Sequence, residues 1–284
     1  MISTEPTAWN DDLLKNPHAV ADKRRRVQQM FAAIAPSYDL NNRLHSLWMD
    51  QAWRRRAVRL AKLKPDDRVV DVACGTGDLT LCFFVHSWFA RTRAKWKAVT
   101  SLDFPQRGQI TGVDFTFEML EAARRKNLTW KGLGDRVGEA RAATKSNIIY
   151  INGDAQSLPL PDACCDIVSI AFGIRNVADP LAAMREFKRI LRPGGRLIIL
   201  EFSLPTNPVL LAMYNFYFRK ILPRTATLIS GDKTGAYKYL PESVNTFIGR
   251  EQMMGMMTTA GFTTVEQFPM TFGVCVCYRG LVMA

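Results

Sequence analysis

The sequence has few of the residues that build metal sites and disulfide frameworks. It contains three histidines and six cysteines in 284 residues, and no two cysteines have the C-x-x-C spacing. Zinc sites and disulfide-rich domains need closely spaced sets of these residues. We therefore expect no metal site, and reduced thiols in a cytoplasmic protein.

Long uninterrupted apolar runs are also absent. The first 22 residues contain four carboxylates and no apolar run, unlike a signal or transit peptide. The most apolar later stretch, residues 196–222, is broken by Glu201, Pro205 and Pro208, which is unfavourable for a membrane-spanning helix. We expect no cleaved leader, and a protein that is soluble or peripheral to a membrane.

Positive charge is abundant. The formal net charge is +12, with 48% hydrophobic and 23% charged residues. This composition is typical of one folded domain, or of one domain with an appendage. The charge indicates attraction to a polyanion, which leaves nucleic acid, an anionic bilayer and a phosphorylated ligand open.

Short apolar segments alternate with helical patterns along most of the chain. The predicted strands are residues 68–73, 109–114, 147–151, 166–171 and 196–201, followed by 264–267 and 272–278. Helices are expected from residue 79, around 119–123, and over 180–191, 208–222 and 247–260. Such alternation predicts an α/β fold with a seven-stranded, mostly parallel sheet covered by helices on both faces.

Two helices are expected before this sheet, between residues 23 and 63, with a turn at 36–39. We predict that residues 1–64 form a helical segment covering the active site, and that residues 65–284 form the main domain. The stretches 83–107 and 131–146 have no regular pattern, so we interpret them as surface insertions.

A glycine turn follows the first predicted strand, in V-D-V-A-C-G-T-G-D (70–78). Glycines allow close backbone approach, and the following helix N-terminus favours anionic ligand groups. Thr80 stands where a dinucleotide fingerprint needs its third glycine, and a Walker A loop is absent. The turn is therefore a candidate ligand loop, although a tight turn without a ligand stays open.

Acidic residues follow the next two strands. Asp114 ends the second strand, where a carboxylate would hold a ribose diol, and Asp154 follows the third, placed to face an adenine amino group. Each aspartate alone is often a loop cap. Together with the glycine turn they predict a nucleoside site at the carboxyl edge of the sheet.

Several longer motifs carry a family resemblance. They are D-x-x-C-G-T-G-D (71–78), G-V-D-F (112–115), G-D-A (153–155), A-F-G-I-R-N-V (171–177), L-R-P-G-G-R-L-I-I-L-E-F (191–202), A-P-S-Y-D-L-N-N (35–42), Y-L-P-E-S-V (239–244), T-F-G (271–273) and R-G (279–280). In this order, and over nearly the whole chain from residue 23, the sequence resembles the bacterial quinone C-methyltransferases that act on demethylmenaquinol and on 2-methoxy-6-polyprenyl-benzoquinol.

The resemblance implies a Rossmann-like class I methyltransferase fold with S-adenosylmethionine as cofactor. The implied cofactor-binding residues are Asp71, Gly75, Thr76, Gly77, Asp114, Phe115, Asp154, Ala155 and Ala171. At Ala171, bacterial relatives often carry a serine that contacts the cofactor. That polar contact must be missing here, or replaced by backbone or water.

The resemblance also implies a prenylated quinol substrate, whose ring carbon attacks the sulfonium methyl. We expect Arg175, Asn176 and Tyr38 to act in catalysis, with Arg175 stabilising a developing phenolate because it cannot serve as a base. Asp39, Tyr239 and Glu242 are expected near the substrate. Structural hydrogen bonds are the alternative role for each, and we do not predict a role for His45.

The alternatives are a methyltransferase that acts on nucleic acid or on another small molecule, and a non-catalytic scaffold. The basic clusters 23–26 and 54–56 would suit a nucleic-acid methyltransferase, but the Asn/Asp-Pro-Pro-aromatic loop and the Pro-Cys nucleophile of such enzymes are missing, so we expect no nucleic acid. A non-catalytic scaffold of a quinone-synthesis assembly is disfavoured by Arg175 and Asn176. Basic segments 23–26, 54–59 and 89–97 predict a peripheral contact at the inner face of the cytoplasmic membrane. A homodimer is compatible with the sequence.

Overall fold

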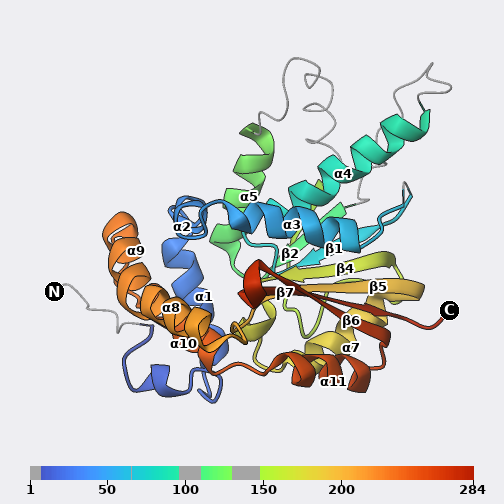
Figure 1. Cartoon of the computed structure of the whole chain (residues 1–284). Coiled ribbons are helices and arrows are strands. Elements are labelled where there is room, and N and C mark those ends of the chain that lie inside the picture. The colour runs from blue at the N-terminus through green and yellow to red at the C-terminus, as the bar shows by residue number, and fades with distance from the viewer. Residues whose placement is uncertain (1–7, 65, 96–109, 130–147) are drawn as a thin grey trace.

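The computed structural model describes residues 8–64, 66–95, 110–129 and 148–284. Its centre is a seven-stranded sheet with the order β3-β2-β1-β4-β5-β7-β6 (Figure 1). The strands are β1 (Val69–Val72), β2 (Ile110–Asp114), β3 (Ile148–Asn152), β4 (Cys165–Ala171), β5 (Leu191–Phe202), β6 (Thr263–Met270) and β7 (Cys275–Leu281). The first five strands are parallel, and β7 runs antiparallel to β5 and β6. The predicted seven-stranded, mostly parallel sheet is confirmed.

Helices cover both faces of this sheet, which explains why its central strands are apolar. Consecutive residues of β5 pack on opposite sides: Ile198 and Leu200 join one core cluster, and Leu197 and Ile199 join the other. The first face is covered by α3 (Met49–Leu60), α4 (Asp78–Lys95) and α5 (Phe117–Thr129), and the second by α7 (Pro180–Ile190) and α11 (Arg250–Thr259).

A third layer of helices lies beyond the carboxyl ends of the parallel strands. It contains α1 (Lys23–Ile34), α2 (Tyr38–His45), α8 (Pro208–Phe216), the π-helical turn η4 (Tyr217–Ile221), α9 (Leu222–Ser230) and α10 (Ala236–Asn245). Val27 and Met30 of α1 share an apolar cluster with Leu222 and Tyr239. The N-terminal helices and the segment after β5 therefore pack together, as Figure 1 shows.

Several predicted elements differ from the structure. The region before β1 has three α-helices rather than two, and the expected turn at 36–39 overlaps the start of α2. Residues 83–95 are helical rather than an insertion, because Phe83 and Phe84 are buried and extend the helix that starts at Asp78. Residues 96–107 and 131–146 of the predicted insertions lie outside the described residues. α3 packs on the sheet although it precedes residue 64. The domain boundary at residue 64 stays a prediction.

The region after β5 also differs from expectation. The helix predicted over 208–222 continues through a π-helical turn to Ser230, and α10 was not predicted because Pro241 lies inside it. The last strand begins at Cys275 rather than at residue 272, because residues 271–273 form a 3₁₀ turn. Within the described ranges, no helix has both the length and the apolar character needed to cross a bilayer.

Candidate active site

The glycine turn between β1 and α4 forms one wall of a cavity at the carboxyl edge of the sheet. Ala73, Gly75 and Gly77 have φ values of 49°, 55° and 80°, in the left-handed region that favours glycine. A Cβ atom on Gly77 would lie 2.7 Å from the Tyr150 hydroxyl, whereas one on Gly75 would meet nothing within 4 Å. Gly77 is thus needed for packing, and Gly75 faces open space where a ligand fits.

Asp114, at the end of β2, is fixed against this turn. Its Oδ2 accepts a hydrogen bond from the Gly75 N–H and its Oδ1 accepts one from the Thr116 N–H, both at 2.8 Å. Burial raises the pKa of this carboxyl group, although the backbone N–H donors act in the opposite direction. The carboxylate is therefore held at a fixed position on the cavity wall.

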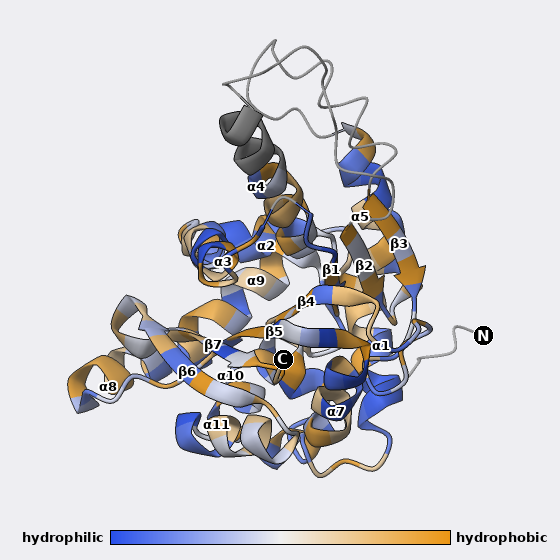
Figure 2. Ribbon diagram, turned by 90° about the vertical axis from the view of Figure 1, so that its right-hand side faces the viewer, coloured by the Kyte–Doolittle hydropathy of each residue, from blue (hydrophilic) through white to orange (hydrophobic). Residues whose placement is uncertain are grey.

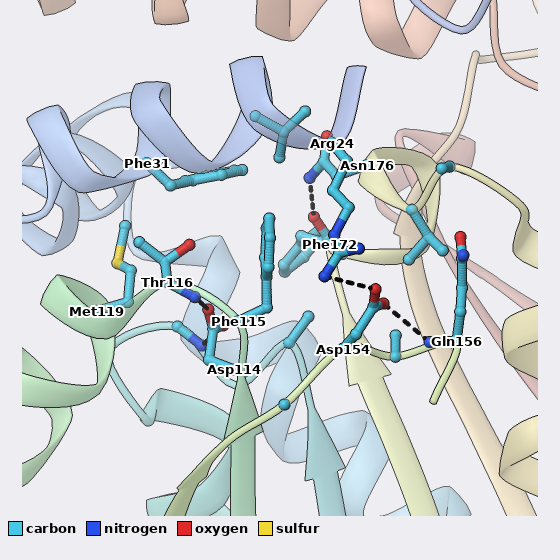
Figure 3. A pocket seen from close by; sticks show the side chains of 18 of the residues that line it. Arg24, Phe31, Asp114, Phe115, Thr116, Met119, Asp154, Gln156, Phe172 and Asn176 are labelled. Carbon is cyan, nitrogen blue, oxygen red and sulfur yellow. Dashed lines mark hydrogen bonds and ion pairs between the residues drawn. The ribbon is translucent and has the colours of Figure 1, made fainter. Parts of the chain in front are cut away.

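Asp154 lies on the other side of the same cavity, next to α1 (Figure 3). Its Oδ1 accepts a hydrogen bond from the Gln156 N–H at 3.0 Å, and its Oδ2 lies 3.1 Å from the Arg24 guanidinium. Arg24 also lies over the Phe115 ring, 5.6 Å from the ring centroid. Helix α1 thus covers one side of this cavity, which we call the edge cavity.

The edge cavity brings together residues from five separate segments of the chain. Its lining includes Arg24, Phe31, Tyr38, Ala73, Gly75, Asp114, Phe115, Asp154, Ala155, Gln156, Ala171, Phe172 and Asn176. Six of the nine predicted cofactor residues are in this lining. The other three are not in this lining: Thr76 and Gly77 lie within the turn, and Asp71 lies in β1 before it.

Two sets of contacts support the turn, one buried and one partly buried. Asp71 accepts hydrogen bonds from Thr80 Oγ1 at 2.6 Å and Ser169 Oγ at 2.7 Å, and burial raises its pKa to about 6. Thr76 Oγ1 donates to Asp39 at 2.6 Å, and Lys126 contacts both residues. Asp39, predicted near the substrate, therefore ties α2 to the glycine turn.

A second cavity, of about 420 Å³, adjoins the first and is mostly apolar. We call it the apolar cavity. Its lining includes Ile34, Trp53, Phe202, Tyr217, Phe218, Leu222, Tyr237 and Leu240. Phe31, Tyr38 and Phe172 line both cavities. The two spaces therefore meet at these three aromatic side chains.

Tyr38 and Phe172 have distinctive properties at this junction. Burial raises the pKa of the Tyr38 phenol above its usual value, so the hydroxyl stays protonated at neutral pH and can donate a hydrogen bond. Phe172 has a φ of 57°, a conformation that costs a residue with a Cβ atom about 1–2 kcal/mol. Non-glycine residues in this region are frequent at functional sites.

Arg175 lines the apolar cavity and is held in a buried ion pair. Its Nη1 lies 2.6 Å from Oε1 of Glu201 and donates to the Phe172 carbonyl at 2.7 Å, while Nε donates to Ser243 Oγ at 3.3 Å. Its Nη2 has no hydrogen-bond partner within the described part of the chain. The guanidinium is thus fixed on one side, and one nitrogen is left for a ligand.

Asn176 and Tyr239 are linked beside this ion pair. The Tyr239 hydroxyl donates to Oδ1 of Asn176 at 2.9 Å, and the Asn176 amide donates to the Phe172 carbonyl at 3.3 Å. Lys23 of α1 donates to the carbonyl oxygens of Arg175 and Val177 at 2.8 and 2.7 Å. The loop after β4 is therefore hydrogen-bonded to α1 through Lys23 and to α10 through Tyr239.

The predicted catalytic residues Tyr38, Arg175 and Asn176 thus lie around one junction, together with Tyr239. Glu242 does not: it accepts a hydrogen bond from Arg219 at 2.9 Å and is absent from both cavity linings. Sequence reasoning missed Phe31, Phe172, Glu201, Lys23 and Lys126. Phe172 and Glu201 were within the quoted motifs, but neither motif indicated a contact with Arg175.

The sequence is similar over most of its length to one family of methyltransferases. Residues 19–282 match the ubiE/COQ5 methyltransferase family. The chain belongs to this family. It is 38% identical over 263 residues to a ubiquinone/menaquinone biosynthesis C-methyltransferase UbiE of a Geobacter species, with 93% of this chain and 99% of the relative covered. It is 41% identical over 251 residues to the demethylmenaquinone methyltransferase of Thermus thermophilus, covering 88% and 99%.

Solved structures support the fold assigned to this member of the ubiE/COQ5 family. A SAM-dependent methyltransferase from Thermotoga maritima superposes with a TM-score of 0.53 at 20% identity, covering 89% of this chain and 98% of that one. A second, from Methanococcus maripaludis, gives 0.52 at 15% identity, covering 88% and 92%. The Rossmann-like class I methyltransferase fold is confirmed, and S-adenosylmethionine is the cofactor that the family and the fold imply.

Proposed function

We propose that this ubiE/COQ5 family member methylates a ring carbon of a prenylated quinol, with S-adenosylmethionine as the methyl donor. The observation that carries the proposal is the junction of the edge cavity and the apolar cavity at Phe31, Tyr38 and Phe172. A polar nucleoside and an apolar acceptor would meet there. The names of the relatives from Geobacter and Thermus thermophilus support a quinone substrate.

The residues of the edge cavity fit the cofactor. Asp114 is placed to accept hydrogen bonds from a ribose diol, because its carboxylate is fixed by two backbone N–H groups. Asp154, Ala155 and Gln156 form the side suited to adenine, and the open space above Gly75 suits the amino-acid portion. When bound, the cofactor supplies an electrophilic methyl group.

The residues at the junction suit activation of a quinol ring. Deprotonation of a ring hydroxyl raises the nucleophilicity of the ring carbon, and a fixed cation stabilises the resulting oxyanion. Nη2 of Arg175 is available for that contact, and the protonated Tyr38 hydroxyl can donate a second hydrogen bond. The hydroxyl proton would pass to water. Formation of the carbon–carbon bond would break the methyl–sulfur bond of the donor, with the thioether as leaving group, and the ring carbon would then pass its own proton to water, which restores aromaticity.

The apolar cavity favours a lipid acceptor over a nucleic acid. Most of its lining is aromatic or aliphatic, and its two arginines, Arg54 and Arg175, are buried in ion pairs with Asp50 and Glu201, whereas a nucleic-acid site needs an exposed cationic surface for phosphates. Two of the predicted basic clusters are also weakened, because Lys23 and Arg54 are buried and paired with backbone carbonyls and Asp50 respectively. We propose a cytoplasmic enzyme that contacts the inner face of the membrane, where such an acceptor resides, and a homodimer stays compatible with this.

The function is tested by methyl transfer to quinols in vitro. We expect the purified protein, with labelled S-adenosylmethionine and a reduced short-chain demethylmenaquinol or benzoquinol, to yield a product heavier by one methyl group by mass spectrometry. Arg175→Lys keeps a cation beside Glu201 but removes the free Nη2, so turnover should fall by about 10²–10⁴-fold with cofactor affinity little changed.

The matched control is Arg219→Lys, which alters the half-exposed ion pair with Glu242. It should keep parental turnover. Equal turnover of Arg175→Lys and the parent would remove Arg175 from the mechanism. A parent protein that methylates neither quinol would contradict the proposed function.

A further inference from the structure

Large apolar side chains are exposed on one side of the helical layer. They come from the loop before α3, from α8 and from α9, and the most exposed are Leu47 (81%), Trp48 (64%), Val209 (66%), Met213 (64%), Phe216 (63%) and Leu228 (86%). Figure 2 shows that the residues of α8 are mostly hydrophobic. Residues of α2 contact α9, and η4 contacts both α8 and α9. The 46–49 loop follows α2, which packs on α9, and α8, η4 and α9 form one continuous helical segment. We call the exposed apolar side chains of this loop and this segment the apolar face.

The loop that displays Leu47 and Trp48 has a strained backbone. The two residues have φ values of 49° and 64°, and neither is a glycine. Two successive left-handed residues persist only where the surrounding structure holds them. Here Ser46 and Asp50 exchange hydrogen bonds across the loop, and Arg43 lies over the Trp48 ring at 5.8 Å. The strain is maintained although Trp48 stays exposed to solvent.

The apolar face surrounds an opening of the apolar cavity. Leu47 and Met49 are exposed side chains that also line this cavity, and Tyr217 and Leu222 line it from η4 and α9. The apolar cavity therefore reaches the surface within the apolar face. A lipid could enter it there beside the exposed Leu47 and Met49 side chains.

The charged side chains that residues 208–230 contribute to this face are all cationic, although Arg219 pairs with Glu242 of α10. Residues 208–230 contain no aspartate or glutamate, and Arg219, Lys220 and Arg224 are exposed among the apolar side chains. Exposed apolar groups mixed with cations and with a tryptophan are typical of surfaces that lie on anionic bilayers. A protein partner with an apolar patch would not require the excess of cations.

We infer that the face formed by the 46–49 loop, α8, η4 and α9 docks on an anionic lipid bilayer and places the opening of the apolar cavity against the lipid. This inference rests on the proposed function, because it assigns a route to the same lipid acceptor. It adds an apolar contact to the predicted basic segments 23–26 and 54–59, in which Arg24, Arg25, Arg55, Arg56 and Arg59 are exposed, whereas the side chains of the predicted segment 89–97 lie outside the described residues. Lys23 and Arg54 in those segments are buried.

The test compares vesicle binding by two variants of equal charge. The face variant combines Trp48→Asn, Met213→Glu and Leu228→Glu, where asparagine tolerates the left-handed backbone at position 48. The control combines Leu128→Glu and Met283→Glu, which are 49% and 73% exposed and belong to α5 and the C-terminal segment. Each variant adds two negative charges. Binding is measured by flotation with phosphatidylglycerol–phosphatidylcholine vesicles at low and high salt.

We expect the parent and the control to float with anionic vesicles, less so at high salt, and the face variant to bind about tenfold or more weakly. Turnover of a short-chain quinol in detergent-free buffer should be the same in all three proteins. Turnover of a long-chain quinol embedded in vesicles should fall only in the face variant.

The outcomes separate the inference from the proposed function. Equal flotation of the face variant and the parent overturns the docking face, even if both methylate the short-chain quinol. A face variant that changes from dimer to monomer in sedimentation, with unchanged vesicle binding, also overturns it, because the face would then bind a second copy. Loss of methyl transfer in the parent would instead contradict the proposed function.

Discussion

Asp114 is the residue on which cofactor affinity should depend most directly. Asp114→Ala removes a fixed carboxylate from the edge cavity and leaves the Gly75 N–H without its acceptor. Affinity for S-adenosylmethionine should fall by about 1.5–3 kcal/mol, or about 10–150-fold. Isothermal calorimetry measures this change. Asp162→Ala, at a carboxylate that is 78% exposed, is the control, and unchanged binding by Asp114→Ala would reject the assignment.

His18 should make folding stability sensitive to mild acid. Burial lowers its pKa from 6.5 to about 4, although a hydrogen bond between its Nε2 and the Ser243 carbonyl, 2.8 Å long, acts in the opposite direction. The folded state therefore keeps the His18 imidazole neutral. The stabilisation is complete above about pH 6.5 and is lost as the pH falls from 6.5 towards 4, where the unfolded chain binds the additional proton.

This dependence can be measured by urea unfolding at pH 7 and pH 5. The parent should lose stability between these values, and His18→Gln should lose less because glutamine does not titrate. His45→Gln, at a histidine that donates to or accepts from Thr225 at 2.8 Å, serves as the comparison. If His18→Gln and the parent lost equal stability, the buried neutral imidazole would not be the cause.

At the scale of elements, the Glu201–Arg175 pair joins β5 to the loop after β4. Glu201→Gln should destabilise the fold by about 3–5 kcal/mol, because it leaves the buried Arg175 guanidinium without its counter-charge. Chemical denaturation measures the loss. The double variant Arg175→Met/Glu201→Gln should recover most of the stability but none of the turnover. A loss below about 1 kcal/mol in Glu201→Gln would show that the pair is unimportant for folding.

The elements that the sequence predicted well are those with a strong local signal. β1, the glycine turn and the start of α4 follow from an apolar run ended by C-G-T-G-D, since parallel strands buried on both faces are apolar throughout. The extent of α4 and the existence of α10 were not predictable. Both helices are stabilised by tertiary packing. Phe83 and Phe84 are buried in α4, and Tyr239 is buried in α10 near Pro241.

The candidate site was predictable where residues follow strand ends, and not where they meet across the fold. Asp114 and Asp154 follow strands whose carboxyl ends share an edge, so their proximity could be inferred. The contacts of Lys23 with the Arg175 carbonyl, and of Asp39 with Thr76, join residues 152 and 37 positions apart. No local sequence pattern indicates contacts between residues so far apart, and the expected place of Asp39 near the substrate stays a prediction.

For the whole molecule, the two cavities show how one sheet edge serves two chemistries. The parallel strands and their loops form most of the edge cavity, under α1, whereas most of the apolar cavity is lined by α1, α2, α3 and the helices after β5. The sequence predicted the first from motifs. It did not predict the second, because aromatic residues at helical spacing are equally expected in a core.

The position of β7 has a consequence for how this chain folds. β7 is the last strand in sequence but lies between β5 and β6, and Trp53 and Arg279 link α3 to the C-terminal region through Thr271 and the Leu60 carbonyl, at 2.8 and 3.1 Å. During synthesis, the edge of β5 that pairs with β7 therefore stays unpaired until residues 275–281 have been made. Such long-range pairing slows folding and exposes a strand edge to other chains. Until β7 pairs with it, the free edge of β5 is a place where a strand of another chain can pair.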